Sequence, residues 1–269
     1  MRYALSPGAL AELARFVQNR PLLAFDIDGT LAPIVSRPWD ARVSQTLQEE
    51  LSRLAARARV AVLTGRAVAD AKGMLGFTPA YLVGNHGAEG VPGGERAAAA
   101  FARICSSWLA TLADTAEAWR ETHGVALEDK VYSLAFHYRH AEDPARARSL
   151  ILQRVARLDP CPVIIHGKLV VNLLAPGAPH KGDAMMALLA HCGCNRGVYI
   201  GDDVTDEDVF RLREPAVLTV RVEHEPGSAA DMYVKGQHEV ERFVHELNKM
   251  VSAPNDNRMA SRVSSRAGR

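Results

Sequence analysis

Hydrophobic and polar positions alternate with two different periods along the chain, and the change of period divides it into parts. In residues 1–88, short apolar runs that end in polar residues alternate with stretches where apolar residues recur every three or four positions. The runs predict buried parallel strands and the spaced stretches predict helices. The strands are predicted at residues 22–25, 60–63 and 80–83.

Two local patterns predict where helices begin in this first part. Ser6 precedes Pro7, and proline is favoured at the first helical position, so a helix is predicted through Phe16. Thr46 and Glu49 have the spacing of a capping box, which predicts a second helix with apolar positions up to Ala58.

The pattern changes after residues 84–89, where two glycines allow a sharp turn away from the sheet, and a domain hinge is predicted at this loop, called the hinge loop below. A long helix is predicted at 95–122, and the period then becomes two. Strands are predicted at 125–127, 133–138, 163–166 and 169–174, with a helix from Asp143-Pro144 to residue 158. Residues 89–175 are therefore predicted to form an inserted α+β cap domain.

The α/β pattern resumes after Pro176 and Pro179, with a helix opening at Lys181 and strands at 198–200 and 217–220. A last helix is predicted at about 239–250. The predicted fold class is thus α/β: a doubly wound parallel-sheet core from residues 1–88 and 176–251, interrupted by the cap. Residues 252–269 are polar and basic without an apolar period, and we expect a disordered tail.

Composition and charge narrow the function classes. The 269 residues are 48% hydrophobic with a formal net charge of +1, which favours a folded globular protein and disfavours nucleic acid or a membrane surface as partner. No apolar run of about eighteen residues occurs. The scattered Cys105, Cys161, Cys192 and Cys194 favour reduced, packed thiols. We expect a cytoplasmic monomer that acts on a small molecule.

Polar residues follow three predicted strands at the edge where parallel strands bring ligands together. Asp26 and Asp28 follow the first strand, Thr64 the second, and an acidic run at 202–208 the third. Each feature alone has a simpler interpretation: an Asp-x-Asp pair occurs in many turns and in metal-dependent glycosyltransferases, and acids favour a helix start. Together with Lys181 they provide what phosphate chemistry needs, namely carboxylates, a divalent cation and a positive side chain.

In order along the chain, these residues resemble the four motifs of the haloacid dehalogenase superfamily of phosphatases. The resemblance implies that Asp26 is the nucleophile that forms an aspartyl-phosphate and that Asp28 is the general acid and base. It also implies that Thr64 and Lys181 bind the phosphoryl oxygens, and Arg66 is a candidate to assist them.

The same resemblance implies a Mg²⁺ cofactor. Its ligands would be the Asp26 carboxylate, the Asp28 backbone carbonyl and Asp202. Asp203 and Asp206 would support these ligands from outside the coordination sphere.

Five further segments resemble one family of that superfamily, the trehalose-6-phosphate phosphatases, over about residues 20 to 250. They are 85–89, 128–130, 137–139, 167–171 and 201–207. The resemblance implies a C2-type cap and hydrolysis of trehalose 6-phosphate to trehalose and phosphate. Through it Glu128 and Lys130 are predicted to bind sugar hydroxyls, since sugar recognition needs paired donors and acceptors.

Further residues are candidates for contact with the substrate. Arg66, His86, Arg139 and Asn172 are candidate substrate-binding residues, while His137 could equally be a packed histidine. Asn172 stands where family members usually carry glutamate, which leaves the disaccharide preference open.

Three alternatives remain at this stage. The chain could act on another sugar phosphate, such as sucrose phosphate or a phosphoglycerate-linked glycoside. It could be a silent binding protein for a phosphosugar, although the intact Asp26 and Asp28 argue against this. A glycosyltransferase would leave Lys181 and Asp202 unexplained.

Overall fold

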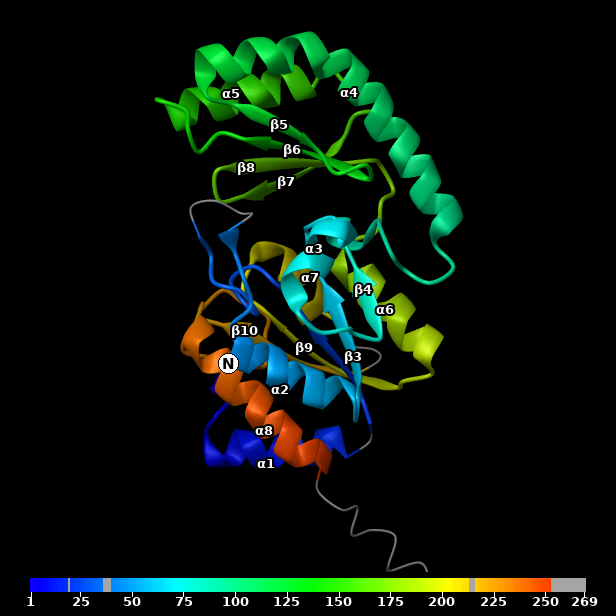
Figure 1. Cartoon of the computed structure of the whole chain (residues 1–269), viewed down its shortest axis with the longest axis vertical. Coiled ribbons are helices and arrows are strands. Elements are labelled where there is room, and N and C mark those ends of the chain that lie inside the picture. Colours follow the sequence, from blue (N-terminus) through cyan, green and yellow to red (C-terminus); the bar gives the residue numbers. More distant parts are fainter. Residues whose placement is uncertain (19, 36–39, 213–215, 253–269) are drawn as a thin grey trace, which may run out of the picture.

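The computed structural model describes residues 1–18, 20–35, 40–212 and 216–252. It contains a seven-stranded sheet of order β1-β11-β10-β9-β2-β3-β4, whose strand pairs are all parallel. A four-stranded antiparallel sheet of order β5-β6-β8-β7 lies at the other end of the molecule (Figure 1). The strands of the parallel sheet are β1 (Arg2–Tyr3), β2 (Leu22–Phe25), β3 (Arg59–Leu63), β4 (Tyr81–Val83), β9 (Arg196–Gly201), β10 (Ala216–Val222) and β11 (Met232–Val234).

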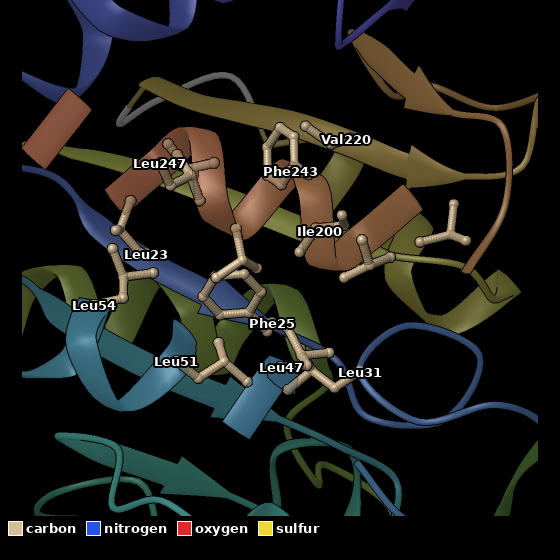
Figure 2. Close-up of a cluster of buried hydrophobic side chains, with 14 of the residues drawn as sticks. Leu23, Phe25, Leu31, Leu47, Leu51, Leu54, Ile200, Val220, Phe243 and Leu247 are labelled. Atoms are coloured by element: carbon tan, nitrogen blue, oxygen red, sulfur yellow. The ribbon is translucent and has the colours of Figure 1, made fainter. Parts of the chain in front are cut away.

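Helices cover both faces of the parallel sheet, because its central strands are apolar on both sides. Leu23 and Phe25 of β2 pack toward a core formed with α1 (Pro7–Val17), α2 (Gln45–Ala55), α3 (Val68–Leu75) and α8 (Val240–Ser252), part of which is drawn in Figure 2. Leu22 and Ala24 pack on the opposite side with α6 (Lys181–Cys192) and the short α7 (Glu207–Phe210). This arrangement is the doubly wound α/β core that the apolar pattern predicted.

The antiparallel sheet consists of β5 (Ala126–Asp129), β6 (Ser133–His137), β7 (Val163–Gly167) and β8 (Val170–Leu174). One face packs on α4 (Glu95–His123) and α5 (Pro144–Val155) through residues such as Phe136 and Leu173. On the other face Glu128 pairs with Ala135, which pairs with Asn172. Because side chains alternate between faces, Glu128, His137 and Asn172 share the face turned away from that core.

Most predicted elements are present within a few residues of their predicted bounds, but the predicted start of the second helix is wrong. The helix begins at Gln45, and the hydroxyl of Ser44 caps it by accepting a hydrogen bond from the Leu47 N–H at 3.3 Å. Thr46 instead donates its hydroxyl to Glu241 at 2.6 Å. Ser44, two residues before the predicted cap Thr46, is therefore the N-cap of this helix.

Several short elements were not predicted, among them β1, α3 and β11. The two strands have two and three residues, too few to show a period. Helix α3 has no side-chain cap and contains Gly73, so it lacks the usual start signal. Of the predicted tail, Ser252 ends α8, and residues 253–269 lie outside the described part of the chain.

The four cysteines are all described and all free. Within the described ranges, no helix combines the length and the apolar character that crossing a membrane requires.

Candidate active site

The carboxyl ends of β2, β3 and β9 face the polar side of the antiparallel sheet across a cavity of about 360 Å³. Eleven of the predicted site residues line it: Asp26, Asp28, Arg66, His86, Glu128, Lys130, Arg139, Asn172, Lys181, Asp202 and Asp203. Thr64 and Asp206 do not line the cavity, and both are almost fully buried. The fold therefore brings together residues that are as much as 177 positions apart, from Asp26 to Asp203.

Lys181 lies between two carboxylates at the first position of α6. Its Nζ is 3.0 Å from Asp26 Oδ1 and 2.7 Å from Asp206 Oδ1, and its side chain is only 2% exposed. Burial alone would lower the pKa of Lys181, but the two carboxylates raise it above the ordinary value. The lysine is therefore a permanent cation at the end of β2.

Both carboxylate oxygens of Asp206 accept hydrogen bonds from groups of the protein. Its Oδ1 accepts hydrogen bonds from Lys181 and from the Tyr199 hydroxyl, the latter at 2.6 Å. Its Oδ2 accepts the backbone N–H groups of Asp202 at 2.8 Å and Asp203 at 2.9 Å. Asp206 thus positions Lys181 and shapes the turn that carries Asp202, which agrees with a supporting place outside a metal's coordination sphere.

Carboxylate oxygens of Asp26, Asp202 and Asp206 lie within 4.8 Å of one another. Burial raises the pKa of Asp26 well above its usual range, although Lys181 opposes this; burial together with the Asp206 charge raises the pKa of Asp202 to about 7. Lys181 therefore does not offset the burial and mutual repulsion of these carboxylates. A bound divalent cation would favour their ionised forms, because hard oxygen donors of this kind suit such a cation.

The Asp202 carboxylate is held by the loop after β2. Thr30 donates its hydroxyl to Asp202 Oδ1 at 3.1 Å. Gly29 has φ +77°, and a Cβ added there would lie 2.0 Å from Asp202 Oδ2. Glycine is thus required both for the turn and for the close approach of the carboxylate.

Asp28 makes a two-point ion pair with Arg66, with Oδ2 2.7 Å from Nε and Oδ1 2.6 Å from Nη2. The Asp28 side chain is 41% exposed, whereas the Asp26 side chain is 6% exposed. The two aspartates therefore have different environments: one is buried against a lysine, and the other is open to the cavity and held by an arginine. A planar guanidinium can orient such a carboxylate on both oxygens.

Thr64 lies beneath the loop that carries Arg66. Its hydroxyl accepts the Arg66 backbone N–H at 3.2 Å, and its backbone carbonyl accepts the His86 N–H at 3.0 Å. In this structure Thr64 therefore shapes the loop, and its predicted contact with phosphoryl oxygens stays a prediction.

His86 packs against Gly65, where an added Cβ would lie 2.4 Å from the imidazole Cε1. Its Nδ1 is buried without a hydrogen-bond partner among the described residues. Burial first, and then the charges of Lys181 and Lys130, lower the pKa of His86 well below its usual value. The imidazole is therefore neutral, and one of its nitrogens is buried without a hydrogen-bond partner among the described residues.

The polar face of the antiparallel sheet provides a second set of groups. His137 Nε2 lies 2.6 Å from Glu128 Oε2, and Lys130 Nζ lies 3.9 Å from the same oxygen. Burial alone would raise the pKa of Glu128, but His137 and Lys130 together hold it below its usual value. Lys130 Nζ also donates to the Gly65 backbone carbonyl at 3.3 Å, so it spans the two sides of the cavity.

Several residues of the site were missed by sequence reasoning. Asp70 and Lys168 line the cavity, and Tyr199 donates to Asp206. Tyr199 lies within an apolar strand, and Asp70 lies in the unpredicted α3, so neither carried a local signal. Only Lys168, at the tip of a predicted hairpin, could have been found from the pattern.

The fold is that of the haloacid dehalogenase-like hydrolases, with an antiparallel sheet inserted between β4 and α6. Within this class, residues 24–241 match the trehalose-phosphatase family model, and the chain belongs to that family. A trehalose-phosphate phosphatase of Mycobacterium bovis is 31% identical over 236 residues, which cover 83% of this chain and 60% of that protein.

The chain is also similar to two further proteins. An uncharacterized glycosyl hydrolase of Mycobacterium tuberculosis is 33% identical over 260 residues, which cover 90% of this chain and 19% of that protein. The crystal structure of a trehalose-6-phosphate phosphatase related protein has a TM-score of 0.71 and 23% identity, and the similarity covers 85% of this chain and 97% of that chain. The chain thus spans about a fifth of the Mycobacterium tuberculosis relative and about three fifths of the Mycobacterium bovis phosphatase.

Proposed function

We propose that this chain is a Mg²⁺-dependent phosphatase that hydrolyses trehalose 6-phosphate to trehalose and phosphate. The observation that carries the proposal is the juxtaposition of two sets of groups across one cavity. Asp26, Lys181 and Asp202 provide a phosphate site on the parallel sheet, and Glu128 and Lys130 face it from the antiparallel sheet. Membership of the trehalose-phosphatase family supports the choice of sugar.

In the proposed reaction an Asp26 oxygen attacks phosphorus, and the bond from phosphorus to the sugar oxygen breaks. Asp28, once it has left its ion pair with Arg66 and taken up a proton, gives that proton to the leaving oxygen. The Asp28 carboxylate then takes a proton from water, which attacks the aspartyl-phosphate and restores Asp26. Lys181 keeps Asp26 oriented and balances charge throughout.

A bound Mg²⁺ would screen the charge of the phosphoryl group and so let a carboxylate approach it. The Asp26 and Asp202 carboxylates would hold it, together with the Asp28 backbone carbonyl, while Asp203 and Asp206 would support them. This chain's part is to supply these oxygens on a rigid sheet edge.

Residues 89–175 act in this proposal as a cap over the core formed by 1–88 and 176–251. The cap carries Glu128, Lys130, Arg139 and Asn172 on the side turned to the cavity. It would bind the sugar and exclude water from the phosphate site.

Phosphate release from a panel of substrates tests the proposal. The panel should include trehalose 6-phosphate, sucrose 6-phosphate, glucose 6-phosphate, a phosphoglycerate-linked glucoside and an aryl phosphate, each with Mg²⁺ and with EDTA. We expect the highest kcat/KM for trehalose 6-phosphate and loss of turnover in EDTA. Failure to release phosphate from any member would refute the phosphatase proposal, and a clear preference for another member would replace the substrate.

The second candidate is a phosphatase of the same mechanism for another sugar phosphate, and Asn172 favours it. Asn172 is 6% exposed, lies in β8 beside Ala135 and lines the cavity with an uncharged amide. An amide can reach a sugar hydroxyl directly or through water, but it lacks the charge of a glutamate.

Asn172→Glu is expected to raise kcat/KM for trehalose 6-phosphate or leave it unchanged, with little effect on an aryl phosphate that does not reach the cap. A charge-assisted hydrogen bond contributes about 1.5 to 3 kcal/mol, which corresponds to a gain of roughly tenfold or more where the added carboxylate reaches the sugar. Asn172→Asp is the matched control, because it adds the charge without the length. Equal effects of Asn172→Glu on both substrates would show that Asn172 supports the fold instead.

Stabilisation by Mg²⁺ is expected to increase as the pH rises through about 7, the value to which burial and the Asp206 charge raise the pKa of Asp202. Because this folded-state pKa lies above the unfolded value, Asp202 contributes stability to the metal-free protein at low pH and loses that contribution as the pH approaches 7. A cation binds the ionised form, so its effect follows the opposite trend. The measurement is the Mg²⁺-induced shift in Tm at pH 5.5 and pH 8.

Asp202→Asn provides the control for this pH effect. The variant should show a smaller Mg²⁺-induced shift that grows less between the two pH values, because Asp26 is then the one remaining carboxylate ligand with a raised pKa. A shift of the same size in the parent protein at pH 5.5 and pH 8 would contradict the assignment of Asp202 as a ligand.

A further inference from the structure

Two consecutive residues of the loop after β4 have left-handed backbone conformations. Asn85 has φ +50° and His86 has φ +58°, both within the short helical turn η2 (Asn85–Gly87). Non-glycine residues seldom adopt this conformation, and they persist in it where surrounding contacts hold them. The backbone reversal directs the two side chains to different partners: His86 packs on Gly65, and Asn85 contacts the cap.

The Asn85 amide is fully buried and uses both of its polar atoms. Its Oδ1 accepts the hydroxyl of Ser133 at 2.5 Å, and its Nδ2 donates to the Lys130 backbone carbonyl at 3.3 Å. Ser133, the first residue of β6, is also fully buried. One side chain of the hinge loop therefore holds both ends of the turn that joins β5 to β6.

Glu89 fixes the orientation of Asn85 from the other side of the hinge loop. Its Oε2 accepts hydrogen bonds from Asn85 Nδ2 at 2.8 Å and from the Val68 backbone N–H at 2.8 Å. Each amide hydrogen of Asn85 thus has an acceptor, and its oxygen is directed at the cap. A buried polar group with all its partners satisfied specifies one arrangement of the elements that it joins.

The turn held by Asn85 is itself in an unfavourable conformation. Val131 is β-branched, has φ +68° and is 54% exposed. The turn closes by a hydrogen bond from the Tyr132 N–H to the Lys130 carbonyl at 2.8 Å, and Asp129 accepts the Val131 N–H at 2.8 Å. Such a turn is a rare, strained form of the γ-turn, so its docking on Asn85 helps to maintain it.

We propose that Asn85 is a positioning residue that, with Ser133, latches the turn at residues 129–133 onto the hinge and thereby places Lys130 over the Gly65 to Arg66 loop. The same peptide that Asn85 holds carries the Lys130 side chain, whose Nζ lies 3.3 Å from the Gly65 carbonyl. The docking of this cap turn on the hinge loop then also determines the position of the Lys130 side chain. The kinetic consequence rests on the proposed function, whereas the latch itself does not.

Three variants separate the latch from general stability. Ser133→Ala removes one hydroxyl, and Asn85→Gly removes the amide while keeping a residue that tolerates positive φ. The double variant combines them. Val131→Gly is the matched control, because it relieves the backbone of the same turn without removing any latch group.

The first measurement needs no substrate. Hydrogen exchange of the peptide covering 129–133 should be at least tenfold faster in Ser133→Ala and in Asn85→Gly, with no change in the hairpin at 163–174. The double variant should be no faster than Asn85→Gly, because both changes remove the same contact. Unchanged exchange at 129–133, or additive effects in the double variant, would overturn the latch.

The second measurement separates positioning from mere support. We expect kcat/KM for trehalose 6-phosphate to fall roughly tenfold in Ser133→Ala and further in Asn85→Gly, mainly through KM, with less than a twofold change for an aryl phosphate. Val131→Gly should keep both parent values. Equal losses on both substrates would overturn the positioning role. If the parent releases no phosphate from any sugar, the proposed function fails while the exchange measurement still decides the latch.

Discussion

Asp26→Asn is expected to abolish turnover, with a loss of roughly 10⁴-fold or more, the scale seen when a covalent nucleophile is removed. The amide is a poor nucleophile and a weaker metal ligand, yet it has the shape of the carboxylate that it replaces. Its oxygen can still accept the Lys181 hydrogen bond that Asp26 accepts at 3.0 Å. The measurement is phosphate release under multiple-turnover conditions.

The same variant should fold at least as well as the parent in the absence of metal. The buried Asp26 carboxylate has a pKa well above its usual range because burial and the neighbouring carboxylates disfavour its charge. A neutral amide removes that repulsion, so the Tm without metal should stay level or rise, and the Mg²⁺-induced shift should shrink.

Asp143→Asn is the matched control for Asp26→Asn. Asp143 caps α5 by accepting the Arg146 N–H, and asparagine caps helices equally well, so activity and Tm should not change. Sustained turnover by Asp26→Asn, with mass spectrometry showing no deamidation to aspartate, would contradict the nucleophile assignment.

Lys181→Met is expected to lose activity and also to destabilise the fold by about 3 to 5 kcal/mol, because breaking a buried ion pair leaves charge without a partner. Methionine fills a similar volume, so the loss reports on charge more than on packing. Lys181 lies between Asp26 at 3.0 Å and Asp206 at 2.7 Å, and both carboxylates are buried. The measurement is the free energy of unfolding in urea together with phosphate release.

The destabilisation should depend on pH in a defined direction. Without Lys181 the buried carboxylates have higher pKa values in the folded protein than in the unfolded chain, so the folded state is favoured at low pH and loses stability as the pH rises. The deficit should therefore be smaller at pH 5 than at pH 8.

Lys249→Met provides the control, because Lys249 is 58% exposed and pairs with Glu246 on the surface of α8. Its effect on stability should stay below about 1 kcal/mol. A Lys181→Met variant with parent stability at pH 8 would mean that the triad of Lys181, Asp26 and Asp206 does not depend on charge balance.

The local sequence was enough to predict most strands and helices of the parallel-sheet domain, because hydrophobic periodicity and the residues that end a strand are properties of neighbouring positions. The apolar run at 22–25 followed by Asp26 and Asp28 is enough to place a buried strand and a pair of carboxylates at its end. In the same way the change of period after residue 122 is enough to predict a separate antiparallel sheet. The start of α2 at Gln45 was missed because Ser44 and Thr46 carry the same capping chemistry, and packing chose between them.

The sequence also showed which types of side chain gather at the candidate site. Only the tertiary structure decided which partner each of these side chains has and how deeply it is buried. Asp28 forms an ion pair with Arg66, and both oxygens of Asp206 accept hydrogen bonds from the protein. Asn85 accepts a hydrogen bond from Ser133 of the antiparallel sheet. The physical reason is that hydrogen-bond partners and burial depend on distances between elements far apart in the chain, and periodicity carries no such information. The identity of the acids could be read from the sequence, whereas their environments, and so their pKa values and roles, depend on the fold.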